Sequence, residues 1–229
     1  MKVSIFNIIL SLAAVFPAIV LHELAHGYVA YLLGDPTAKS RGRLTLNPLA
    51  HMDPIGSVLV PLVLVIVRSP YLFGWAKPVP INPNYFRDPF KGLFYVAIAG
   101  PITNLFLALS AAGLGHLVLV GLSDSLLFGR GSFTAFVVQI AFGLLGFFVI
   151  VNVVLAVFNM LPIPPLDGSR VLTYFLPPAG RKAMMALEQY GFLLLLALVL
   201  LGGLSGLFHV TSGLWKGLLG IRWFAVMAT

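Results

Sequence analysis

Two histidines and a glutamate, His22, Glu23 and His26, lie close together inside an apolar run that extends from about Val3 to Leu33. Side chains four positions apart lie on one face of a helix, so both imidazoles could bind a single Zn²⁺ ion. Glu23 is turned by about 100° from its neighbour, which suits a general base for hydrolysis better than a third ligand. The spacing therefore predicts a catalytic zinc site.

The alternative is a chance match, because only three of the five positions in this motif are fixed. The surrounding run argues against chance, since it is longer than the roughly 20 apolar residues that span a bilayer. Charged side chains near the centre of a spanning helix cost about 2.5–3.5 kcal/mol each. Ionisable groups in such a segment are therefore kept mainly where they serve a function.

The composition is that of a membrane protein. Of the 229 residues, 59% are hydrophobic and only 9% are charged, whereas soluble domains carry about 25% charged residues. The mean hydropathy is +1.01, and apolar segments alternate with short polar loops. We predict an all-α, multi-pass transmembrane protein that forms a single integral-membrane domain over residues 1–229, with the lipid bilayer as its surroundings.

The charged residues limit the partners and the metal ligands. The net charge is +7, but the basic residues are dispersed through loops and form no patch interleaved with exposed aromatics, so we predict no nucleic-acid binding. The chain has no cysteine, and any metal must be held by His, Asp or Glu. The seven acidic residues are Glu23, Asp35, Asp53, Asp88, Asp124, Asp167 and Glu188.

Several apolar segments are long enough to be membrane helices. An additional C-terminal helix with an interfacial tail is predicted over about residues 188–229. Gly34 to Pro36 are expected to stop the first helix. The individual helices are predicted over residues 4–33, 92–122, 133–161 and, near the C-terminus, 192–208, with the tail over 209–229.

The apolar stretch Ile55–Val67 is about 13 residues long, which is short for a full crossing. We predict a short re-entrant segment here. Arg43–Leu46 could form a short strand, while Trp75–Pro83 is too rich in proline for a regular helix. The region around the re-entrant segment is therefore predicted to be a small β-hairpin or an extended loop.

Basic residues gather in three loops, over residues 39–43, 68–91 and 170–182. The link 122–132 carries only one, Arg130, so the positive-inside rule places the three basic loops in the cytoplasm. If 54–68 is re-entrant, His26 and Asp167 both lie towards the cytoplasmic side, whereas a full crossing would separate them. The charges favour re-entrance and a site in the cell membrane near its cytoplasmic face.

Asp167 follows three prolines, Pro162, Pro164 and Pro165, at the end of an apolar helix. Prolines break helical hydrogen bonding, and irregular backbone at membrane depth is tolerated where it is buried in protein or lines a wet cavity. An aspartate there needs a partner. Two histidines and one carboxylate would leave a fourth position open, as in catalytic zinc sites. A solvated residue at a helix end is the alternative.

Three motifs occur in order: the His22–His26 pentapeptide, Gly100–Asn104 and Asn159–Gly168. Together they resemble the site-2 protease family of intramembrane zinc metalloproteases, over about residues 5–175. The pattern is similar to the compact subgroup that lacks PDZ and CBS domains. The resemblance implies a three-helix catalytic core and regulated intramembrane proteolysis. The substrate would be a transmembrane protein, with a single span or a hairpin, whose helix has unwound locally.

The resemblance also implies the roles of individual residues. One zinc ion per chain would be held by His22, His26 and Asp167, with Glu23 as the base. Two asparagines, Asn104 and Asn159, match family positions thought to bind the unwound substrate backbone or the developing oxyanion. Helix packing by buried amides, worth on the order of 1 kcal/mol each, is the alternative for both.

Two functions without proteolysis remain as alternatives. A metal transporter would use intramembrane His and Asp residues as a transit site. A catalytically silent relative would bind membrane segments without cleaving them. Assembly into a homo-oligomer is left open.

Overall fold

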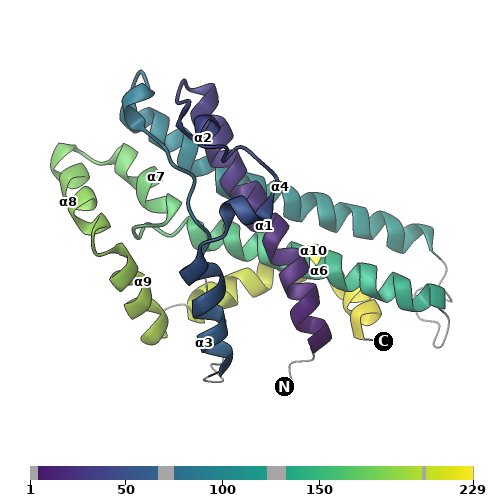
Figure 1. Ribbon diagram of the computed structural model, residues 1–229. Coiled ribbons are helices and arrows are strands. Elements are labelled where there is room, and N and C mark those ends of the chain that lie inside the picture. The colour runs from purple at the N-terminus through teal and green to yellow at the C-terminus, as the bar shows by residue number, and fades with distance from the viewer. Residues whose placement is uncertain (1–4, 67–74, 123–132, 203–204, 229) are drawn as a thin grey trace.

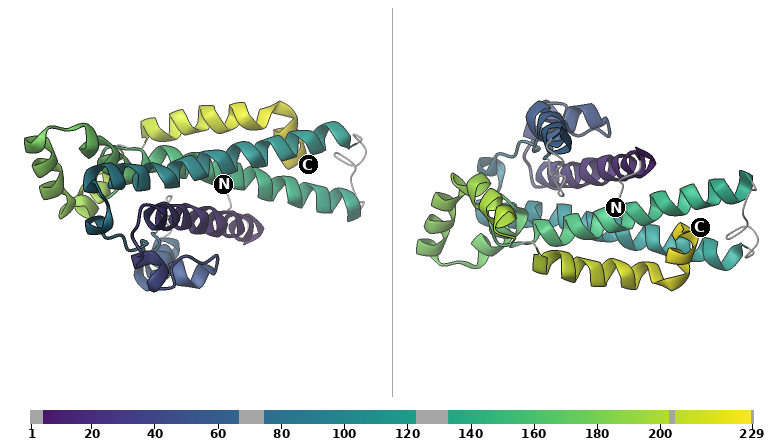
Figure 2. Two further views of the ribbon diagram at one scale, coloured as in Figure 1. Left: turned by 90° about the horizontal axis from the view of Figure 1, so that it is seen from above. Right: turned by 90° about the horizontal axis from the view of Figure 1, so that it is seen from below.

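The computed structural model describes residues 5–66, 75–122, 133–202 and 205–228. Three helices form its centre: α1 (Ile5–Leu32), α4 (Pro89–Gly121) and α6 (Phe133–Asn159) (Figure 1). Each of these helices contacts the other two, and α4 and α6 run antiparallel, side by side (Figure 2). Within the described ranges, these are the helices long and apolar enough to cross a membrane. This agrees with the predicted all-α, multi-pass architecture.

Small residues allow the central helices to approach each other closely. The buried positions of α4 are mostly Gly and Ala, and its large side chains, such as Phe106 and Leu117, are 66% and 74% exposed. In lipid, close backbone approach replaces the hydrophobic effect as the main source of helix association. The small buried residues of α4 are Gly92, Ala97, Gly100, Ala108, Ala111, Ala112 and Gly115.

Buried or capping carboxylates fix the loops that flank α1 and α4. As predicted, α1 ends at Leu32, just before Gly34. The buried Asp35 accepts hydrogen bonds from Thr37 N, at the start of the short helix α2 (Thr37–Ser40), and from Asn82 N at 2.7 Å. Asp88 accepts from the first amides of α4 and caps that helix. These contacts hold the segment before α4 against the end of α1.

The segment 47–82 extends away from the central helices, and its two ends lie next to each other. A 3-10 helix (Pro48–His51), a π-helical stretch (Pro54–Leu59) and α3 (Val60–Ile66) lead outward. The chain comes back at Trp75, whose N–H donates to Gly56 O at 3.2 Å. Next to it, Met52 and Ala76 form an isolated antiparallel bridge. Residue 67, the last of the predicted apolar stretch, lies outside the described residues.

The predicted β-hairpin is reduced to this single bridge. The residues after Arg43, up to Leu46, form bends, and no strand occurs in the described parts of the chain. Arg43 contacts the returning chain through its side chain, which donates to Lys77 O. The extended loop of the prediction is present over residues 77–82.

The C-terminal part differs from the prediction. The expected helix over 192–208 is two helices, α9 (Gly191–Leu200) and α10 (Ser205–Ala228), because the chain turns at Gly202, whose φ is +72°. Such a φ favours glycine and ends a helix. They are preceded by α7 (Asp167–Phe175) and α8 (Pro178–Glu188), which lie beside the N-terminal end of α4 (Figure 2).

The predicted interfacial tail packs on the central helices. α10 contacts α6 and α4, and its Trp223 is fully buried and donates to Phe142 O at 3.3 Å. A position confined to the membrane surface would leave this indole partly exposed. Of the predicted polar link 122–132, residues 123–132 lie outside the described residues.

Candidate metal centre

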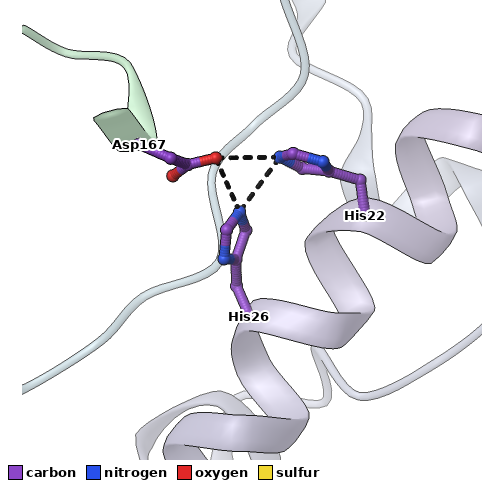
Figure 3. Close-up of side chains that lie close together, drawn as sticks. All are labelled: His22, His26 and Asp167. Atoms are coloured by element: carbon purple, nitrogen blue, oxygen red, sulfur yellow. Dashed lines mark hydrogen bonds and ion pairs between the residues drawn. The ribbon is translucent and has the colours of Figure 1, made fainter. Parts of the chain in front are cut away.

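Three predicted ligands meet in the structure. His22 and His26 lie on one face of α1, and Asp167 is the first residue of α7. The Nε2 atoms of the two histidines are 3.0 Å apart, and the Asp167 Oδ2 atom lies 3.2 Å from each of them (Figure 3). All three residues are buried. The structure thus brings α1 and the start of α7, which follows the proline-rich segment 162–165, to one point.

The other ring nitrogens decide where the histidine protons lie. His22 Nδ1 is 2.5 Å from Asn104 Oδ1, and His26 Nδ1 is 2.6 Å from the carbonyl oxygen of Val96. Both partners are acceptors, so each Nδ1 carries a hydrogen and each neutral ring presents the lone pair of Nε2 to the centre.

With both rings neutral, the centre collects three electron pairs. The buried Asp167 Oδ2 atom has no hydrogen bond with any described residue, although two ring nitrogens lie beside it. Three lone pairs at separations of 3.0–3.2 Å repel each other unless a cation lies between them. Tetrahedral zinc with bonds of about 2.0–2.1 Å keeps its ligand atoms roughly 3.3 Å apart. The donor set and its size fit zinc, with a fourth position left open.

Gly100 gives the two imidazoles their space. A Cβ atom at this position of α4 would lie 2.5 Å from His22 Cε1 and from His26 Nε2. Real carbon contacts are not this short, so the absence of a side chain lets α4 lie directly against the rings. The backbone of the Gly100–Asn104 motif therefore forms one wall of the centre.

We expect Gly100→Ala to weaken zinc binding by at least about tenfold, the range seen when groups that support metal ligands are disturbed. The added methyl group must displace one of the rings. The matched control is Gly113→Ala on the same helix, where a Cβ would meet nothing within 4 Å and alanine favours the helix. Zinc affinity, measured by competition with a coloured chelator, should change only in the first variant. Equal affinities would contradict this role of Gly100.

Glu23 is held by the extended segment that precedes α4. Its Oε2 atom accepts a hydrogen bond from Val79 N at 2.9 Å. That segment is fixed in turn by Arg43, which donates to Lys77 O, and by Asp35, which accepts from Asn82 N. One carboxylate oxygen is thus oriented by the main chain. The other, Oε1, has no hydrogen bond from the described residues and can accept a proton.

The two predicted asparagines lie in different environments. Asn104 is fully buried, and its amide contacts His22, Ala18 O at 3.3 Å and Asn152 Oδ1 at 2.7 Å. These contacts favour the alternative of a buried packing amide over substrate binding. Asn159 is half-buried, and its Nδ2 donates to Leu155 O of its own helix at 3.0 Å.

Four contributors to the centre were not predicted from the sequence. Asn152 could have been noticed, because it is one of the few polar side chains of a mostly apolar helix and lies two turns before Asn159. Gly100 was part of a motif but had no predicted role. The contacts made by the main-chain groups of Val79 and Val96 could not be predicted from the sequence, since every residue carries such groups.

Known proteins resemble this chain in sequence. The model of peptidase family M50 matches residues 77–201, a stretch that contains Gly100–Asn104 and Asn159–Gly168. "Putative zinc metalloprotease YwhC" of Bacillus subtilis is 44% identical over 78% of this chain and 74% of its own length. "Putative zinc metalloprotease Rip2" of Mycolicibacterium smegmatis is 32% identical over 86% and 69%.

A more distant organism has a similar protein. "Putative zinc metalloprotease MJ0611" of Methanocaldococcus jannaschii is 32% identical to this chain, over 75% of it and 73% of its own length. No solved structure matches the chain significantly. These relatives come from bacteria and an archaeon, and their names agree on zinc and on a protease activity.

Proposed function

This chain belongs to peptidase family M50, and from that membership we propose that it is a zinc-dependent endopeptidase that cleaves within or next to transmembrane segments. Family membership and the apolar helices establish the broader class, a zinc metalloprotease of membranes. One observation supports the finer proposal most directly. The ligand atoms of His22, His26 and Asp167 converge where three membrane-type helices meet.

The proposed roles follow from the geometry of the centre. His22, His26 and Asp167 would hold one zinc ion through Nε2, Nε2 and a carboxylate oxygen. When bound, the ion would supply Lewis-acid chemistry that activates a water and polarises a peptide carbonyl. Asn104 and Val96 keep the two imidazoles in the tautomer that can bind it.

Glu23 carries the proton transfers in this proposal. Its carboxylate takes a proton from the water as the water attacks the carbonyl carbon. It then donates that proton to the leaving nitrogen. The Val79 amide holds Oε2, so the free oxygen, Oε1, is the natural proton carrier. General acid–base catalysis of this kind contributes about 10²–10⁴-fold to a rate.

The substrate must be unwound before it can react. A peptide bond inside a helix has its carbonyl hydrogen-bonded and shielded by side chains. We propose that Asn159 binds the unwound substrate backbone or the developing oxyanion, for which its half-buried position is suitable. Its amide would then exchange the bond to Leu155 O for one to the substrate.

We place the centre near the cytoplasmic face of a cell membrane. The paired ends of residues 52–76 support a re-entrant segment, because a chain that starts and ends at one point does not change sides. Lys39 lies in α2, and Arg41 and Lys77 lie in the adjoining loops, as the positive-inside rule requires of the cytoplasmic side. Water can reach a centre near this face.

The proposal is tested with two matched single-span peptides in liposomes that contain the purified protein. One has an all-leucine helix, and the other has an Asn-Gly pair at the same depth as the centre. We expect cleavage of the second only, lost with a chelator and restored by zinc. Equal cleavage of both peptides, or of water-soluble peptides alone, would contradict cleavage of unwound transmembrane segments.

A further inference from the structure

Two buried amides connect α6 to the candidate metal centre. Asn104 Nδ2 donates to Asn152 Oδ1 at 2.7 Å, and Asn104 Oδ1 lies 2.5 Å from His22 Nδ1. Both asparagines are fully buried. Each of the three central helices thus supplies one side chain to a polar chain that ends on a metal ligand: Asn152 on α6, Asn104 on α4 and His22 on α1.

Main-chain carbonyl groups determine which way the side-chain amides of Asn104 and Asn152 are oriented. Asn104 Nδ2 also donates to Ala18 O at 3.3 Å, and Asn152 Nδ2 donates to Phe148 O at 2.8 Å. If either amide were turned by 180°, its oxygen would face a main-chain carbonyl oxygen and would have no donor there. A buried polar group without a partner costs about 1–3 kcal/mol. The two carbonyls therefore select one orientation for both amides.

That orientation determines the state of His22. Because Asn104 presents its oxygen, the His22 proton must lie on Nδ1, which leaves the lone pair of Nε2 facing His26 and Asp167. With the Asn104 amide reversed, its NH₂ group would require a lone pair on Nδ1. The ring proton would then move to Nε2 and occupy the position of the metal.

We propose that Asn152 is a positioning residue for the zinc site, which acts through Asn104 to fix the tautomer of His22. The inference rests on the proposed zinc-dependent function. Groups that orient metal-ligating histidines typically contribute 10–100-fold to metal affinity. Asn104 contacts His22 directly and should contribute more to zinc affinity than Asn152, which acts through Asn104.

The test measures zinc affinity of the purified full chain in detergent, by competition with a coloured chelator. We expect a loss of about 100-fold for Asn104→Leu and about tenfold for Asn152→Leu. The double variant should match Asn104→Leu, because Asn152 has no route to His22 without Asn104. Losses that multiply, or an unchanged affinity in Asn152→Leu, would overturn the proposal.

A packing control separates positioning from general destabilisation. Val149→Ala removes volume from the same buried face of α6, three residues before Asn152, and takes away no polar atom. It should lower the unfolding temperature and leave zinc affinity unchanged. If it weakens zinc binding as much as Asn152→Leu does, the amide has no specific role.

A second measurement decides the case even if Asn152→Leu does not fold. Nitrogen NMR of the metal-free wild type, with labelled histidine and at a pH where the rings are neutral, reports which nitrogen of His22 carries the proton. We expect Nδ1, and a proton on Nε2 would overturn the proposal. If this result is as expected but the wild type binds no zinc, the proposed function fails and the zinc role of Asn152 fails with it.

Discussion

Replacing Glu23 by glutamine is expected to lower peptide-bond cleavage by about 10²–10⁴-fold and to leave zinc bound. Glutamine keeps the shape of the side chain and can still accept the Val79 N–H through its amide oxygen. It cannot take a proton from water. The ligand atoms of His22, His26 and Asp167 are untouched. Cleavage of the Asn-Gly peptide and zinc content are measured on the same preparation.

The matched control is Glu188→Gln, at an exposed glutamate that pairs with Arg170 at 3.6 Å. This variant should cleave at the wild-type rate. Three results would count against the role of Glu23: retained cleavage, loss of zinc together with activity, or zinc transport into sealed vesicles that continues in Glu23→Gln. The last result would favour the metal transporter.

Replacing Asp167 by alanine is expected to remove zinc. The variant loses one of three converging ligand atoms, and disturbing groups that only support such ligands already costs 10–100-fold in affinity. We therefore expect a loss greater than about 100-fold. Zinc content by mass spectrometry should fall from about one ion per chain to a small fraction, with His22→Ala behaving in the same way.

Folding must be checked for both variants, because the centre joins α1 to α7. The unfolding temperature in detergent, measured without zinc, should stay close to that of the metal-free wild type. A well-folded Asp167→Ala protein with a full complement of zinc would break the proposed ligand set. Well-folded wild type without zinc would favour the silent relative.

The central helices could be predicted because length and hydrophobicity decide them. The expected ranges 4–33, 92–122 and 133–161 lie within a few residues of α1, α4 and α6. Their ends carry local signals, such as Gly34 after α1 and Asp88 before α4. In lipid, a helix lets a long apolar segment satisfy all of its backbone hydrogen bonds within itself.

The C-terminal region was predicted less well, because composition alone could not decide it. Apolar residues continue through Gly202, yet the positive φ there ends the helix. Trp223 was expected at the membrane surface, where tryptophan is common, but it is buried against α6. Both outcomes depend on contacts between elements, and a sequence pattern within one element carries no trace of them.

The residues of the candidate site likewise fall into those that a local sequence pattern predicts and those that depend on contacts between helices. The pair His22 and His26 follows from helical spacing, and Asp167 from a proline-rich helix end together with the family resemblance. Contacts across helices were not predictable: Asn104 meets a ring nitrogen, and Gly100 meets two rings. Asn104 and Asn159 were predicted either to bind substrate or to pack helices as buried amides, and Asn104 lies buried between α1, α4 and α6 against His22.

The division of the centre among separate helices makes zinc part of the assembly equilibrium of the protein. In the proposed site α1 and α7 would provide the ligands, and α4 and α6 would orient one of them, so the separated helices would have no preformed site. A ligand that binds only the assembled state stabilises it by RT ln(1 + [L]/Kd), about 2.7 kcal/mol at 100 times Kd. Metal starvation should therefore shorten the lifetime of the protein as well as silence it.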